Sequence, residues 1–158
     1  MATVEASRPA ARIALTLSAA AAGAAQKLVG RLGPWQLVKL LGEGNLTRVY
    51  QSRPADAPSS QPAAYVVKLL RKEWWRDPQA IEVQRREAWV GSQVSHPNLV
   101  PVLSASVKEP PFFVVMPKLE GANLAQILAE QGRLDVPVAL WIARQTADAL
   151  AALFGATS

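Results

Sequence analysis

Two charged residues in apolar surroundings are the strongest chemical signal in this 158-residue sequence. Lys68 interrupts a hydrophobic strand pattern at residues 64–70, and Glu87 lies among valines on one face of a predicted helix. Taken alone, Lys68 would more simply be a solvent-facing residue of an edge strand. A buried charge without a partner is costly, however, so we predict that Lys68 and Glu87 form an ion pair across a strand–helix interface.

A glycine-containing turn precedes the lysine. Gly42-Glu43-Gly44 separates two predicted strands, and glycines allow a hairpin backbone to approach a phosphate with its N–H groups directed at the oxygens. The Gly-x-Gly pattern alone also fits an ordinary hairpin turn. Together with a lysine that is held by an acidic partner, the turn favours a phosphate-binding site.

Three predicted antiparallel strands position these groups: residues 35–41, 47–53 and 64–70. The stretch at 54–62, rich in Pro, Ala and Ser, predicts an exposed loop. Asp77 followed by Pro78 is typical of a helix N-terminus, and this helix should end near Val94. Its predicted inward face carries, at helical spacing, Val83, Glu87, Val90 and Val94.

The rest of the sequence alternates between extended and helical patterns. Extended segments at 99–107 and 112–116 flank a turn at 109–111, and a short helix at 121–130 has Asn123 as its cap. A longer helix covers residues 136–154. Its apolar stripe consists of Leu140, Ala143, Ala147, Leu150 and Phe154. The order of the elements predicts an α+β fold.

Composition excludes several classes of function. There is no cysteine, and His96 is the single histidine, which argues against thiolate chemistry, metal centres and a Ser-His-Asp triad. The net charge of +5 comes from scattered residues rather than a basic stripe, so we do not expect nucleic-acid binding. No apolar run reaches the roughly 18 residues that span a bilayer, so we do not expect a membrane protein.

The ordered set of motifs resembles the protein kinases, and in style the bacterial Ser/Thr kinases. The glycine turn, Lys68, Glu87, His96-Pro97-Asn98 and the segment 114–121 follow one another as in that family, and the resemblance covers residues 34 to about 154. It implies a small lobe at 34–116, a hinge at 117–123 and an incomplete large lobe with two helices at 124–158. The small lobe would contain a five-stranded antiparallel sheet and one main helix.

The resemblance also implies a role for each matching residue. Lys68 would hold the α- and β-phosphates of ATP and pair with Glu87, Met116 would be the gatekeeper, and Glu120 or Asn123 would lie nearest the ribose. The implied nucleotide-binding residues are Leu41, Gly42, Glu43, Gly44, Asn45, Thr47, Val49, Val66, Lys68, Met116, Pro117, Leu119 and Asn123. Two residues depart from the pattern, because Thr47 replaces the third glycine and Pro117 stands where an acidic residue is common.

The first 33 residues precede this region, and we expect them to form a poorly ordered or helical extension. Arg8 and Arg12 followed by the Ala-rich stretch 13–25 also fit a secretory signal. We favour the extension and a cytoplasmic location, because the rest of the sequence is suited to using ATP.

The catalytic motifs of the family do not occur in these 158 residues. His-Arg-Asp and Asp-Phe-Gly are absent, and Leu153-Phe154-Gly155 lacks the aspartate that binds magnesium. We therefore expect a truncated Ser/Thr kinase that is inactive alone, with Mg²⁺ and a protein substrate bound only by a complete kinase. The alternatives are a non-catalytic, pseudokinase-like nucleotide-binding or scaffolding module, and a similar fold without a nucleotide site. The stripe on helix 136–154 would lack its usual packing and could bind a partner or a second copy.

Overall fold

The computed structural model of the protein describes residues 28–157, and the interpretations of the first 27 residues lie outside this range. Its elements, in chain order, are β1 (Gly30–Leu32), β2 (Trp35–Glu43), β3 (Thr47–Pro54), β4 (Tyr65–Leu70), the 3-10 helix η1 (Lys72–Trp74), α1 (Pro78–Gln93), β5 (Ser104–Ser106), β6 (Phe113–Pro117), α2 (Leu124–Gln131) and α3 (Val136–Thr157). The predicted α+β class is confirmed.

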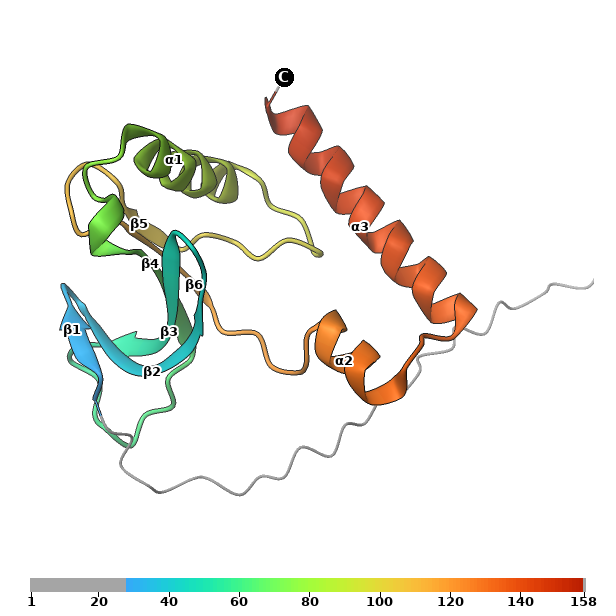
Figure 1. Ribbon diagram of the computed structural model, residues 1–158, viewed down its shortest axis with the longest axis horizontal. Coiled ribbons are helices and arrows are strands. Elements are labelled where there is room, and N and C mark those ends of the chain that lie inside the picture. The colour runs from blue at the N-terminus through green and yellow to red at the C-terminus, as the bar shows by residue number, and fades with distance from the viewer. Residues whose placement is uncertain (1–27, 158) are drawn as a thin grey trace, which may run out of the picture.

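The strands form one antiparallel sheet in the order β1-β2-β3-β4-β6-β5, and α1 packs against β4, β5 and β6 (Figure 1). The sequence predicted five strands, and β1 is the additional one. The expectation that residues 30–32 belong to a poorly ordered or helical extension was wrong. These residues pair with residues 35–37 of β2, so the pairing, rather than an alternating pattern of their own, makes them a strand.

Side chains along β4 alternate between the two faces of the sheet and so divide the core into two clusters. Val67 is fully buried on one face, where the buried cluster contains Leu37, Val67, Phe113 and Val115. Leu70 lies on the opposite face, where it is buried with Ala80 of α1 and Phe112. Because Lys68 is two residues from Leu70, the alternation directs its side chain to the same face, toward α1.

The start of α1 follows the predicted chemistry. The side chain of Asp77 accepts hydrogen bonds from the backbone N–H groups of Gln79 and Ala80, both at 2.9 Å, and Pro78 occupies the first helical position. The helix ends at Gln93, one residue before the predicted end. The local sequence is therefore sufficient to set the N-terminus of this helix.

The predicted inward face of α1 was wrong. Val83 is 56% exposed, and the buried residues of the helix are Ala80, Gln84 and Ala88. Ala80 packs against Leu70 and Phe112, and the side chain of Gln84 bonds the carbonyl of Lys68. Near the C-terminal end of the helix the chain before β5 lies very close, because a Cβ atom added to Gly91 would lie 2.4 Å from Cγ2 of Val102. Val83 is therefore turned away from the sheet, and Glu87 is half-buried.

The chain between α1 and β6 is less regular than predicted. Only Ser104–Ser106 of the predicted extended segment 99–107 forms a strand, β5. Upstream of it, the backbone N–H of Val102 donates to the carbonyl of Gly91 at 3.0 Å. The side chain of Asn98 donates to the side-chain oxygen of Gln145 in α3 at 2.7 Å. The segment thus bridges the sheet and the last helix instead of continuing a strand.

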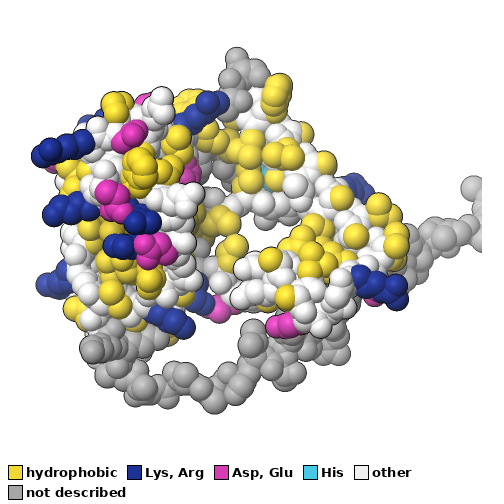
Figure 2. Space-filling view, in the orientation of Figure 1, with side chains coloured by type: hydrophobic (Ala, Val, Ile, Leu, Met, Phe, Trp, Pro, Cys, Tyr) yellow, Lys and Arg dark blue, Asp and Glu magenta, His cyan; other side chains and the backbone are white. Residues whose placement is uncertain are grey.

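The helices α2 and α3 form an arm beside the sheet (Figure 1). The predicted cap of α2 is confirmed, because Asn123 and Gln126 bond each other's backbone N–H groups in a capping box. Among residues 136–156 of α3 only Ala149 is buried, whereas Leu140 and Leu150 of the predicted stripe are 65% and 59% exposed. Hydrophobic side chains accordingly gather along the surface of the arm (Figure 2). Within residues 28–157, no helix combines the length and apolarity needed to cross a bilayer.

Candidate nucleotide-binding site

Lys68 and Glu87 form the ion pair that the sequence predicts. The ammonium of Lys68 on β4 lies 2.8 and 2.7 Å from the two carboxylate oxygens of Glu87 on α1. Both side chains are partly exposed, at 29% and 33%, so solvent or a bound anion can reach the ammonium. The pair therefore holds a positive charge at the surface of the sheet that faces α1, without removing it from water.

A second contact joins the same two elements. Gln84 is 2% exposed and lies one helical turn before Glu87 on α1. Its side-chain amide donates to the backbone carbonyl of Lys68 over 3.4 Å, a long hydrogen bond. Sequence reasoning missed this residue, although the spacing of Ala80, Gln84 and Ala88 at four-residue steps could have indicated the buried face.

The hairpin between β2 and β3 presents the glycine turn. The backbone N–H of Gly44 donates to the carbonyl of Thr47 at 2.8 Å and closes the turn. Leu41 is an extra residue in the β2–β3 register, because Leu40 pairs with Tyr50 and Gly42 with Val49. No atom lies within 4 Å of a Cβ position built on Gly42, so the backbone there is open to a ligand.

The strand register brings the remaining predicted site residues of the sheet onto one face. Residues that pair directly across antiparallel strands project to the same side. Val49 pairs with Lys68, and Val66 pairs with Met116. Because Val66 and Lys68 are two residues apart on β4, all four side chains lie on the face that carries the ion pair.

The predicted hinge, residues 117–123, begins at the last residue of β6. The backbone N–H of Lys118 donates to the carbonyl of Ala64 at 2.9 Å, which ties the hinge to the chain entering β4. Leu119 is 68% exposed. The two residues expected nearest the ribose both have local partners: Glu120 forms an ion pair with Lys118 at 2.5 Å, and Asn123 caps α2. The structure does not favour one of them over the other.

The tip of the glycine turn is surrounded by charge. The carboxylate of Glu43 lies 3.1 Å from Arg48 and 3.4 Å from Arg71. The hydrogen bond from Arg48 lowers the pKa of Glu43, and the positive charges of Arg48 and Arg71 add to this effect. The same hydrogen bond raises the pKa of Arg48. Sequence reasoning treated Arg71 only as part of a scattered basic surface.

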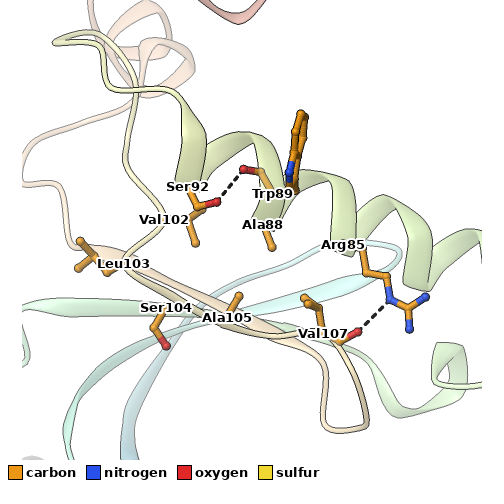
Figure 3. Close-up of a pocket in the computed structure, with 9 residues that line it drawn as sticks. All are labelled: Arg85, Ala88, Trp89, Ser92, Val102, Leu103, Ser104, Ala105 and Val107. Atoms are coloured by element: carbon orange, nitrogen blue, oxygen red, sulfur yellow. Dashed lines mark hydrogen bonds between the residues drawn. The ribbon is translucent and has the colours of Figure 1, made fainter. Parts of the chain in front are cut away.

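A separate hollow lies between α1 and β5 (Figure 3). It is lined mainly by small and apolar side chains, and at one end Nε of Arg85 donates to the carbonyl of Val107 at 2.9 Å. None of the predicted nucleotide-binding residues lines it. The hollow therefore lies apart from the predicted nucleotide-binding residues, although it is on the same side of the sheet as Lys68, because Ala105 and Lys68 both pair with Val114.

A metal site does not emerge from the described part of the chain. Among residues 28–157, no three His, Asp or Glu side chains converge as ligands. No carboxylate of this part of the chain is therefore assigned to magnesium, which proteins usually hold with one or two carboxylates and the phosphates of a substrate.

Comparison with known proteins decides the family. Residues 35–156 match the family described as protein tyrosine and serine/threonine kinase, which covers most of the chain. The chain belongs to this kinase family. The match begins at the first residue of β2 and ends within α3, so it contains the ion pair, the glycine turn and the hinge.

Curated relatives include bacterial Ser/Thr kinases, which confirms the resemblance. Serine/threonine-protein kinase PknH of Mycobacterium tuberculosis is 32% identical over 118 residues, or 75% of this chain and 18% of PknH. PrkC of Bacillus subtilis is 29% identical over 119 residues, again 75% of this chain and 18% of the relative. The chain thus spans about a fifth of the length of these relatives.

Solved structures show the same fold. The kinase domain of M. tuberculosis PknI superposes with a TM-score of 0.61 at 20% identity, over 84% of this chain and 51% of that domain. The similarity therefore extends over about half of a solved kinase domain.

Proposed function

We propose that this chain supplies the ATP-binding part of a Ser/Thr protein kinase, which in complete form transfers the γ-phosphate of ATP to hydroxyl groups of a protein substrate. The observation that carries the proposal is the Lys68–Glu87 pair, on the sheet face next to the glycine turn. Membership of the kinase family supports it. ATP is a cytosolic molecule, so we place the chain in the cytoplasm.

Each part of the site has a proposed role. The ammonium of Lys68 holds the α- and β-phosphates, and Glu87 orients that ammonium. The backbone of Pro117 and Leu119 meets the edge of the adenine, which needs only the carbonyl of the proline. The residues proposed to contact the nucleotide with their side chain or backbone are Leu41, Gly42, Glu43, Gly44, Asn45, Thr47, Val49, Val66, Lys68, Met116, Pro117, Leu119 and Asn123.

Phosphoryl transfer requires groups that these 158 residues do not include. The sequence contains neither His-Arg-Asp nor Asp-Phe-Gly, so it supplies no base for a substrate hydroxyl and no aspartate for magnesium. We propose that this polypeptide alone binds nucleotide without transferring phosphate. Magnesium and the protein substrate would then be held by residues outside it.

A second candidate function is a non-catalytic binding module. The observation that favours it is the apolar surface of α3, where Leu140, Trp141 and Leu150 are each more than half exposed. Such a surface is typical of protein–protein contacts, and residues 136–154 would then bind a partner or a second copy. Concentration-dependent association in sedimentation experiments, abolished in Trp141→Ser, would support this role.

A thermal shift experiment tests the proposed ATP site. Mg-ATP should raise the melting temperature of the chain, because a ligand that binds only the folded state stabilises it. The shift should disappear in Lys68→Ala and persist in Lys39→Ala, which removes an exposed lysine from β2. If Mg-ATP does not shift the melting temperature of the parent chain, the proposal is wrong.

A further inference from the structure

The strongest unexplained contacts join the tip of the glycine turn to the segment after β4. We propose that Arg71 and Trp74, together called the loop anchor, position the turn so that three consecutive backbone N–H groups face the phosphates of ATP. This inference rests on the proposed function, because it assigns positioning residues to the same site.

The loop anchor bonds three consecutive carbonyl groups. The backbone N–H of Arg71 donates to the carbonyl of Leu46 at 2.9 Å, and its guanidinium donates to the carbonyl of Gly44 at 3.2 Å. The indole N–H of Trp74 donates to the carbonyl of Asn45 at 3.0 Å. Every carbonyl from residue 44 to residue 46 is therefore held by the anchor.

The direction of each anchored carbonyl also determines the direction of the N–H group in the same peptide. In a trans peptide the carbonyl and the following N–H point in opposite directions, and the cis bond among residues 28–157 is elsewhere, at Pro110-Pro111. The anchored carbonyls therefore direct the N–H groups of Asn45, Leu46 and Thr47 away from Arg71 and Trp74. Several consecutive backbone N–H groups that face one direction form a site for an anion such as a phosphate.

Packing and charge reinforce the anchor. Leu46 and Trp74 both pack against the buried cluster around Leu70, so the tip is held by apolar contact as well as by hydrogen bonds. Arg71 also lies 3.4 Å from Glu43, and its Nε donates to the Glu73 carboxylate at 2.7 Å. The two carboxylates therefore hold the guanidinium in the position from which it bonds the carbonyl of Gly44.

The anchor matters because an exposed glycine turn is mobile, and ordering it on binding reduces affinity. A turn that is already held in place loses less conformational entropy when phosphates bind. The effect should be confined to ligands with phosphates, since the anchor touches neither Met116 nor the hinge. Adenosine, which lacks phosphates, should bind equally well with and without it.

The experiment compares two adjacent tryptophans in the complete 158-residue chain. Trp74→Phe removes the indole N–H that bonds Asn45 but keeps an aromatic ring in the cluster. Trp75→Phe is a matched control, because Trp75 packs against the same cluster and its indole donates to the carbonyl of Leu70 at 2.9 Å rather than to a carbonyl of residues 44–46. Arg71→Lys provides a second test, since it keeps the charge but loses the forked donors.

Isothermal titration calorimetry with Mg-ATP and with adenosine gives the first readout. We expect Trp74→Phe and Arg71→Lys to weaken Mg-ATP binding about three- to ten-fold, the range of one hydrogen bond, and to leave adenosine binding unchanged. Trp75→Phe should leave both ligands unchanged. Equal or tighter Mg-ATP binding in Trp74→Phe would overturn the inference, and tighter binding would show that the anchor closes the site instead.

Amide hydrogen exchange gives a second readout that needs no nucleotide. Residues 44–47 should exchange faster in Trp74→Phe than in Trp75→Phe. Unchanged exchange there overturns the anchor whether or not ATP binds. If the parent chain binds no ATP, the proposed function fails and the role of the anchor at phosphates fails with it, even if the exchange result holds.

Discussion

The part of the chain that contains the sheet and α1, residues 28–117, differs sharply in packing from the helical arm, residues 118–157. All the buried hydrophobic residues except Ala149 lie in the sheet part. The arm exposes large apolar side chains, among them Leu140 and Trp141, at 65% and 64%. Figure 2 shows hydrophobic side chains gathered along the arm, while most of the visible Lys and Arg side chains lie on the sheet part.

The difference shows which part of the structure is stabilised from within. The sheet part buries both faces of β4 and holds Lys68 and Glu87 in a fixed relation, so it contains the chemistry together with its own support. The arm is helical because of local sequence, including the Asn123 cap, and little tertiary packing holds it. Substitutions of the same type should therefore have unequal effects in the two parts.

Leucine to alanine substitutions should show the largest difference in the free energy of unfolding between the sheet part and the arm. Leu70 is 1% exposed, so Leu70→Ala should reduce the free energy of unfolding by about 2 to 5 kcal/mol. Leu140→Ala should change it by less than about 0.5 kcal/mol, because that side chain is 65% exposed. Urea unfolding followed by circular dichroism measures both. Equal effects would contradict the division into a packed part and an unpacked arm.

Glycine to alanine substitutions should give a smaller contrast. In Gly91→Ala the new Cβ would meet Val102 at 2.4 Å, and the resulting strain should cost about 1 to 3 kcal/mol, partly offset by the better helix propensity of alanine. Gly155 in α3 has nothing within 4 Å of its Cβ position, so Gly155→Ala should be neutral or slightly stabilising. If Gly155→Ala lowers the free energy of unfolding and Gly91→Ala does not, the division into a packed part and an unpacked arm is contradicted.

Removing the hydrogen bonds that join the two parts should reduce the free energy of unfolding only modestly. Asn98 bonds the side chain and the carbonyl of Gln145 at 2.7 and 3.2 Å in an exposed position. Asn98→Ala should therefore cost no more than about 1 kcal/mol and should speed amide exchange in α3 without changing exchange in β4. Ser95→Ala, in the same loop, serves as the control. Unchanged exchange in α3 would mean that this contact does not hold the arm.

The smallest effect concerns the charge at the glycine turn. Arg48 lowers the pKa of Glu43, so the stability that the Glu43 carboxylate contributes is present above its ordinary pKa and is lost as the pH falls through the lowered value. In Arg48→Gln the pKa of Glu43, followed by NMR titration, should rise toward 4.5. Lys39→Gln should not change it. A pKa of Glu43 that is the same in Arg48→Gln would exclude Arg48 as the cause.

Features that depend on local sequence could be predicted well. The caps at Asp77 and Asn123 and the central strands β2, β3 and β4 follow from side chains close in sequence. The Lys68–Glu87 pair could be predicted because each charge is costly to bury alone, and pairing them offsets both costs.

Features that depend on tertiary packing could not be predicted. Contacts with the sheet and with Phe112 bury Ala80 and Gln84, whereas an apolar pattern points to the valines. The strand β1 exists through pairing, and three residues are too few to reveal an alternating pattern in the sequence. The anchoring of the glycine turn by Arg71 and Trp74 joins residues that are distant in sequence, and no local pattern indicates it.

The most direct test of the central claim is a map of amide protection by Mg-ATP over the whole chain. The account predicts slower hydrogen exchange at residues 41–49, 65–68 and 116–119, which form the glycine turn, the lysine strand and the hinge. It predicts no direct protection in α3, and loss of the protection in Lys68→Ala. Protection that is absent from these segments, or that is confined to α3, would contradict the assignment of this face of the sheet as an ATP site.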